Sequence, residues 1–367
     1  MQEHTHGGDA DGWFAPVQTR DERAWSHDPA SFGVADRRDP MWKLSDLDRL
    51  APLIEAAGEP VTTESDAPTA FRPEDVVSAA AWRRGGTRVV EVAGASSSPI
   101  HLVLGGDELP PNVLVEAVPG ASGTVVLEHR GSAAYAQNVA IHVADGAELT
   151  LVSVQEWAND AVHSAAHQAV VGAGAKLKHI IVSLGGGVVR VNTNVRLEGD
   201  GAEGQLLGLA FADGGQHLES QVFLHHVGRH TKGDVTYKGA LQGERARTVW
   251  VGDVLIGPDA VGTDSYEQNR NLILTPGARA DSIPNLEIET GEILGAGHAS
   301  ATGRFDDEQL FYLMSRGIPE EEARRLVVIG FLAEILQQIH DAELQERLTA
   351  AVEGEIASAL LPAGAGR

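Results

Sequence analysis

The chain has 367 residues, which exceeds the size at which one hydrophobic core usually stops growing, so we expect a long repetitive body with appendages, or two domains. Its formal net charge of -24 argues against nucleic acid and anionic membranes as partners, because both would repel it. It contains no cysteine, a secretion signal is not evident, and no apolar run is long enough to cross a bilayer. We therefore predict a cytoplasmic protein.

The first region, residues 1–85, is rich in Asp, Pro and Arg. A scattered helical pattern is present, chiefly at residues 41–57 and 73–83, where apolar residues recur at helical spacing. We therefore predict a partly helical N-terminal region.

The second region, residues 86–305, consists of short apolar or alternating segments separated by Gly and Asp, which is typical of an all-β body. A stacked β-solenoid would explain both the β-branched residues and the 42 glycines, with a sandwich or jelly roll as the alternative. No strict period is visible, so the solenoid prediction depends partly on the resemblance described below. The predicted strands are residues 100–104, 113–118, 124–129, 139–143, 149–154, 177–184, 188–197, 205–211, 218–227, 235–241, 248–256 and 286–288.

The third region, residues 306–367, has the pattern of a helical domain. Gly317 is well placed to end a first helix, and Pro319 to begin a second, whose apolar residues are spread so widely that it should pack on two sides. A last helix carries one apolar stripe. The pattern alone favours a cap over the end of the solenoid, and a docking platform for another protein is the alternative.

One stretch, residues 269–318, carries a long and specific motif, NRNLILTPGARADSIPNLEIETGEILGAGHASATGRFDDEQLFYLMSRGI. It resembles the SufB/SufD family, whose members are scaffold subunits of the Suf iron-sulfur cluster assembly machinery. Residues 226–241 and 260–268 fit the family less sharply, residues 319–339 continue the similarity, and the first eighty or so residues hardly take part. The resemblance implies a mainly β protein with a right-handed β-helix core between the two helical regions.

Two positions point to the SufD branch of the family, and a third departs from it. SufB-type chains carry a cysteine where this chain has Ala278, and a glutamate directly after the motif histidine, where this chain has Ala299. Many SufD chains have a cysteine two residues before that histidine, but Ala296 stands there, so a second local thiol is excluded. By resemblance, His298 lies at the interface with a SufB-type partner and builds the cluster with the partner's cysteine.

Chemistry supports this role for His298. Iron-sulfur centres are normally held by Cys thiolates, and a chain without thiols cannot hold one alone, but a neutral imidazole can replace a thiolate when the other ligands come from elsewhere. The flanking Gly295 and Gly297 allow close backbone approach, which suits either a subunit seam or a tight turn capped by the histidine.

The resemblance also implies partners and further site residues. The protein would be a non-enzymatic scaffold subunit that shares a transient iron-sulfur cluster with a SufB-type chain, the interface including His298, Gly297, Pro284 and Glu287. A SufC-type ABC ATPase, which would hydrolyse the ATP, would dock on Phe311, Tyr312, Arg316, Leu326, Phe331, Leu332 and Ile335. A cysteine desulfurase or sulfur-transfer protein would act through SufB, a homodimer could form without SufB, and a flavin could join the complex, although no residues identify its site.

Other histidines and glycines have simpler interpretations. His163 and His167, like His226 and His230, have helix-type metal spacing, but on a strand this offset separates the side chains by roughly 13 Å, too far for one metal ion. We expect them to be structural or solvated. The three glycines at 185–187 lack the Lys-Ser/Thr of a phosphate loop and indicate a turn.

Two alternative functions remain open from the residues themselves. Glu287 and Glu289 alternate along a predicted strand and could act in a β-solenoid enzyme that cleaves polysaccharide, although aromatic residues for sugar stacking make up only 5% of the chain. A stand-alone interaction or metal-storage module would bind metal by itself, which the histidine spacings do not favour.

Overall fold

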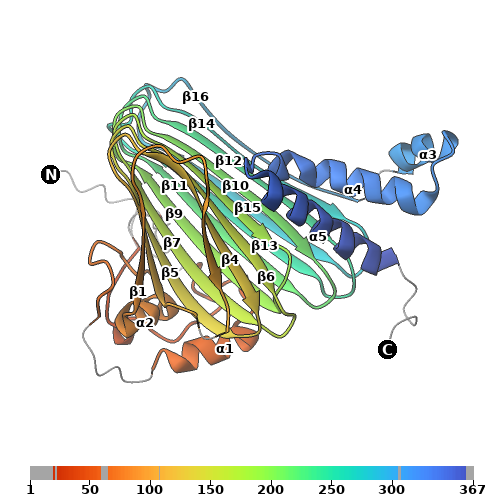
Figure 1. The fold of residues 1–367 in the computed structure, drawn as a ribbon, viewed down its shortest axis with the longest axis horizontal. Coiled ribbons are helices and arrows are strands. Elements are labelled where there is room, and N and C mark those ends of the chain that lie inside the picture. The colour runs from red at the N-terminus through yellow and green to blue at the C-terminus, as the bar shows by residue number, and fades with distance from the viewer. Residues whose placement is uncertain (1–19, 21–22, 59–64, 107, 305–306, 361–367) are drawn as a thin grey trace, which may run out of the picture.

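The computed structural model describes residues 20, 23–58, 65–106, 108–304 and 307–360, and its centre is a β-solenoid (Figure 1). Each turn of the solenoid gives one strand to each of two eight-stranded sheets, and every pairing is parallel. Parallel stacking confirms the solenoid and excludes the sandwich or jelly roll. Sheet A holds β1 (Thr87–Val92), β3 (Asn112–Ala117), β5 (Ala134–Val143), β7 (Val162–Val171), β9 (Val188–Leu197), β11 (His217–His226), β13 (Arg247–Ile256) and β15 (Arg279–Ile288).

Sheet B faces sheet A across the core and is stacked in the same way. Alternate side chains of both sheets point inward, as the pleat requires, and Val, Leu and Ala fill most of the space between the sheets. The strands of sheet B are β2 (Ile100–Leu104), β4 (Ser122–Gly131), β6 (Glu148–Trp157), β8 (Lys176–Ser183), β10 (Glu203–Ala212), β12 (Lys232–Leu241), β14 (Asp264–Ile273) and β16 (Gly295–Arg304).

The turns between strands vary in length, which is why the sequence shows no fixed period. Ala134 pairs with Val162, 28 residues further on, whereas Arg247 pairs with Arg279, 32 residues further on. The three glycines at 185–187 form one of these turns, as predicted, and the Gly186 amide donates to the Trp157 carbonyl at 3.0 Å. Gly186 has a φ of 98°, a conformation that favours glycine.

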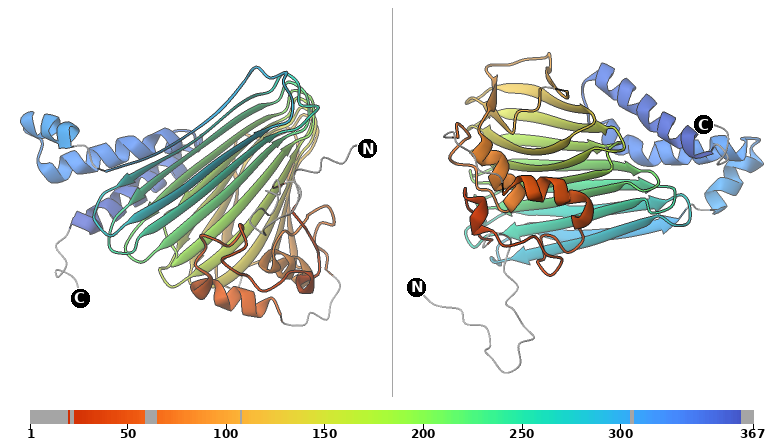
Figure 2. Two further views of the ribbon diagram at one scale, coloured as in Figure 1. Left: turned by 180° about the vertical axis from the view of Figure 1, so that it is seen from behind. Right: turned by 90° about the horizontal axis from the view of Figure 1, so that it is seen from below.

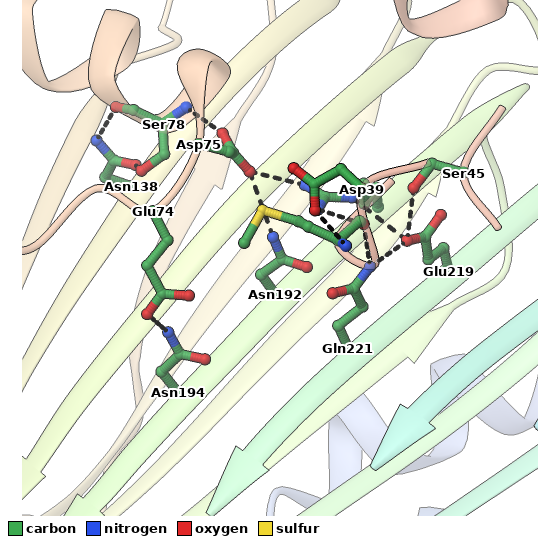
Figure 3. A network of polar contacts seen from close by, with 12 residues as sticks. Asp39, Ser45, Glu74, Asp75, Ser78, Asn138, Asn192, Asn194, Glu219 and Gln221 are labelled. Carbon is green, nitrogen blue, oxygen red and sulfur yellow. Dashed lines mark hydrogen bonds and ion pairs between the residues drawn. The ribbon is translucent and has the colours of Figure 1, made fainter. Parts of the chain in front are cut away.

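The N-terminal helices cover the outer face of sheet A. Asp46 and Asp75 cap the starts of α1 (Leu47–Ala56) and α2 (Val76–Arg84), which pack on β5 and β7 and follow a 3-10 turn, η2 (Pro29–Ser31). Under them lies a buried network of polar side chains that includes Asp75 and Glu219 (Figure 3). The Arg190 guanidinium contacts Asp75 at 2.9 Å and Glu219 at 3.3 Å.

The C-terminal helices α3 (Asp307–Ser315), α4 (Glu320–Leu336) and α5 (Ala342–Leu360) lie on the side of sheet B (Figure 2). As predicted, α4 packs on two sides, against β10 and β12 and against α5. The expected cap over the solenoid's end is wrong. The helices cover the outer face of sheet B instead, because outward residues there, such as Leu207 and Phe211, are apolar and need cover. Within the described residues, no helix combines the length and apolar character needed to span a bilayer.

Candidate functional site

The candidate site lies at the last turn of the solenoid. β15 and β16 end the two sheets, so each has a neighbouring strand on one side only among the described residues. Most of β16 is exposed, whereas strands in the middle of the solenoid are largely buried. An exposed, unpaired edge strand is a template on which another chain can pair.

His298 lies in the middle of β16, at this edge. Its side chain is 46% exposed, and it faces Glu267 of β14 in the strand register. The alternative of a histidine that caps a turn is wrong, since His298 belongs to a regular strand. At Gly297, an added Cβ would lie 3.2 Å from the Tyr266 ring, so the small residue leaves room for that aromatic side chain.

Glu267 is a candidate that sequence reasoning missed. Its side chain is 1% exposed, and its Oε1 lies 3.7 Å from His298 Nδ1, beyond hydrogen-bond distance. Within the part of the chain that the structure describes, neither carboxylate oxygen accepts a hydrogen bond of normal geometry. Burial, and then the charge of Asp253, raises the pKa of Glu267 to about 8, against a smaller opposing effect of the Asn285 backbone amide.

The inward residues of β14 are polar, unlike the Val, Leu and Ala that fill most of the space between the sheets. Asn269 and Asn271 follow Glu267 at alternate positions and are buried. Asn271 donates to Asn269 at 2.6 Å, and Ser282 of β15 donates to the same Asn269 oxygen at 2.6 Å. These amides are satisfied by one another, and the carboxylate beside them is not. The alternation of polar residues in DSYEQNRN is the signal that could have revealed this inward face.

The other predicted interface residues lie on β15. Pro284 is partly buried and opposite Gly252 of β13, a place where an edge strand tolerates proline. Glu287 is exposed on the same strand, and Glu289 is exposed just beyond its end. The last two strands thus bring Pro284, Glu287, Gly297 and His298 to one end of the solenoid.

The residues predicted to dock an ATPase fall into two groups. Phe311 and Tyr312 of α3 are 73% and 54% exposed, Leu326 of α4 is 41% exposed, and the guanidinium of the exposed Arg316 lies 4.8 Å from the Tyr312 ring. The other group faces the solenoid: Leu332 and Ile335 are buried, and Phe331 is partly buried beside Lys238 of β12. Leu332 and Ile335 therefore belong to the internal core and not to an accessible surface.

The four histidines with helix-type metal spacing are structural or solvated, as expected. His163 and His167 point into the solenoid, and burial holds the pKa of each well below its usual value. His226 is buried between two hydroxyl groups, whereas His230 is exposed. Among the described residues, no group of three or more His, Asp or Glu side chains is arranged to hold a metal ion.

Together, these features define a parallel β-solenoid protein that presents a histidine at an unpaired sheet edge. Residues 104–331 match the family model described as "SUF system FeS cluster assembly, SufBD core domain". The chain therefore belongs to the SufBD family of iron-sulfur cluster assembly proteins. This assignment confirms the resemblance and takes the place of the alternative function, a polysaccharide-acting enzyme.

Several known proteins are similar to this chain. An iron-sulfur cluster assembly SufBD family protein of Mycobacterium leprae is 46% identical over 363 residues, covering 90% of this chain and 93% of the relative. A second SufBD family protein of the same organism is 29% identical over 221 residues, covering 59% of this chain and 25% of the relative. The iron-sulfur cluster assembly protein SufD of Escherichia coli is 26% identical over 289 residues, covering 70% of this chain and 66% of the relative.

Proposed function

We propose that the protein is a SufD-type scaffold subunit that pairs with a SufB-type chain and builds a nascent iron-sulfur cluster at their shared interface. The observation that carries this proposal is the half-exposed His298 on the unpaired edge strand of a chain without cysteine. The similarity to Escherichia coli SufD supports it, and so does the presence of two different SufBD relatives in one organism.

The chemistry of the interface follows from what this chain lacks. An iron-sulfur cluster needs several ligands, usually thiolates, and this chain offers an imidazole and carboxylates. The partner would supply the cysteine, and β16 would supply His298 together with backbone groups for pairing. This division makes the cluster a shared substrate, and the chain alone should hold none. The absence of cysteine is compatible with a cytoplasmic location.

Docking of a SufC-type ABC ATPase belongs to the same proposal. Phe311, Tyr312 and Leu326 expose large apolar side chains on α3 and α4, and Arg316 lies beside them. Exposed aromatic residues next to an arginine are typical of protein interfaces. The ATPase would dock on this surface and hydrolyse ATP in its own active site. This chain would transmit the resulting movement as a scaffold without catalysing a reaction itself.

The test is anaerobic co-expression of the tagged chain with a cysteine-bearing SufB-type chain and a SufC-type ATPase, followed by iron, sulfide and subunit counts. We expect His298→Ala to retain complex formation and to lower the cluster yield by at least about tenfold, since one ligand is lost. The matched control is His142→Ala, which removes an exposed strand histidine of β5. An unchanged cluster yield in His298→Ala would contradict the proposal, as would a chain that remains alone, as monomer or homodimer, with both partners present.

A further inference from the structure

Glu267 and His298 place a buried carboxyl group beside a half-exposed imidazole. Glu267 is a fully buried carboxyl group whose oxygens accept no hydrogen bond of normal geometry from any described residue. A buried polar group without a partner is costly, and such groups are rare unless a ligand or an ion completes them. Because Glu267 of β14 lies opposite the half-exposed His298 of the edge strand, this carboxyl group is close to solvent.

The distance between the two groups is informative. His298 Nδ1 and Glu267 Oε1 are 3.7 Å apart, which is too long for a hydrogen bond. Two ligand atoms that each lie about 2.1 Å from one transition-metal cation are roughly 3 to 4 Å apart. The spacing is therefore that of two ligands of a single cation, and also that of an ion pair if the imidazole is protonated. Imidazole nitrogen with carboxylate oxygen is a usual ligand pair for divalent iron, cobalt and zinc.

We propose that Glu267 and His298 form two ligands of a divalent transition-metal site at the open end of the solenoid, occupied by ferrous iron when a cluster is assembled. The identity of the metal rests on the proposed function, while the two-ligand geometry stands on the structure alone. The site is incomplete within the chain, so water fills the remaining positions until a partner contributes its own ligands. Glu267 is the ligand that this inference adds to the proposed function, since it gives the edge histidine an anionic co-ligand from the neighbouring strand.

The experiment titrates Co²⁺ alone into the purified, metal-free full-length chain, followed by visible absorption and calorimetry. We expect one Co²⁺ per chain and at least about a tenfold loss of affinity in Glu267→Gln and in His298→Ala. Glu267→Gln keeps the shape of the side chain, and its circular dichroism spectrum establishes that the variant is folded. The controls are His142→Ala and Glu289→Gln, which remove an exposed histidine and an exposed carboxylate away from the pair and should bind as the parent chain does.

Two results would overturn the site. One is no saturable Co²⁺ binding by the parent chain below about 1 mM, and the other is equal affinity in the parent chain and in Glu267→Gln. Cluster yield in the co-expressed complex separates this inference from the proposed function. If His298→Ala lowers the yield while Co²⁺ does not bind, the cation site fails and the scaffold role stands. If Co²⁺ binding depends on both residues while both variants assemble clusters normally, the scaffold role of His298 fails and the cation site stands.

Discussion

The two outer faces of the solenoid are covered by helices in chemically different ways. On sheet A, most outward residues of β9 and β11 are charged or polar, and Arg190 and Glu219 are completely buried beneath the N-terminal segment. On sheet B, outward residues of β8 and β10 such as Ile180 and Leu209 are apolar and pack on α4 and α5. Strand composition at alternate positions thus decides the chemistry of each cover.

The N-terminal cover (α1, α2 and the segment before them) and the C-terminal cover (α4 and α5) are therefore held on the solenoid by different interactions. The Arg190 guanidinium lies between two carboxylates and 4.1 Å from the Trp42 ring, an arrangement that fixes one geometry. An apolar contact is less directional, so α4 and α5 depend on area and shape. The polar links around the C-terminal cover, such as Arg347 with Glu128, are partly exposed. We therefore expect the N-terminal cover to be sensitive to the loss of one charge, and the C-terminal cover to the loss of packing.

The largest effect is expected from removing Arg190. Arg190→Gln would leave Asp75 and Glu219 buried without their cation, and breaking a buried ion pair costs about 3–5 kcal/mol in the free energy of unfolding. The matched change in the other cover, Arg347→Gln, removes a partly exposed arginine and should cost less than about 1 kcal/mol. Urea denaturation measures both. Equal losses would mean that the two covers do not differ in the way proposed.

Much of this architecture could be predicted from the sequence. Apolar alternation predicted most of the strands, but β1, β7, β14 and β16 were missed. In β7, β14 and β16, most inward positions carry polar residues or Ala, so the apolar signal is weak. The position of the C-terminal helices was wrong for another reason. A helical pattern shows which face of a helix is apolar, but not which surface it will meet.

The site was predicted only in part. The motif and its resemblance drew attention to His298, and the register places it on the open edge of sheet B. Glu267 was missed because a glutamate in a polar segment is normally exposed. Its inward orientation depends on pairing with β12 and β16, which are distant in sequence. Likewise, the apolar residues of α4 gave no indication of which ones, such as Leu332, face the solenoid.

The next effect tests the apolar cover with two leucines of one helix. Leu332→Ala removes a fully buried side chain from the contact between α4 and sheet B, and we expect a loss of about 3 kcal/mol in the free energy of unfolding. Leu326→Ala, on the exposed side of α4, should change it by no more than about 0.5 kcal/mol. Urea denaturation again provides the measurement. A large loss in Leu326→Ala would indicate that this leucine serves the fold and would weaken its assignment to a docking surface.

The smallest expected effect concerns the interior that the covers enclose, and it is the pH dependence of the free energy of unfolding. Burial holds the pKa of His129 and His179 at about 4 and that of His163 well below its usual value, so these residues stay neutral in the folded protein. The unfolded chain binds protons below about pH 6.5, so the stability from each histidine is present above that pH and is lost as pH falls toward 4. Glu219, under the N-terminal cover, differs: burial opposes its charge, but the hydrogen bond from His217 and the charge of Arg190 lower its pKa to about 2.

Between pH 6.5 and 5, the ion pair of the N-terminal cover therefore persists while the buried histidines already reduce stability. We expect His163→Gln to flatten the slope of the unfolding free energy against pH in this window by up to about 1.4 kcal/mol per pH unit, the value of one proton. His142→Gln, an exposed control on β5, should leave the slope unchanged. Urea denaturation at several pH values provides the measurement. If the slope of His163→Gln equals that of the parent chain, His163 does not contribute to the loss of stability in mild acid.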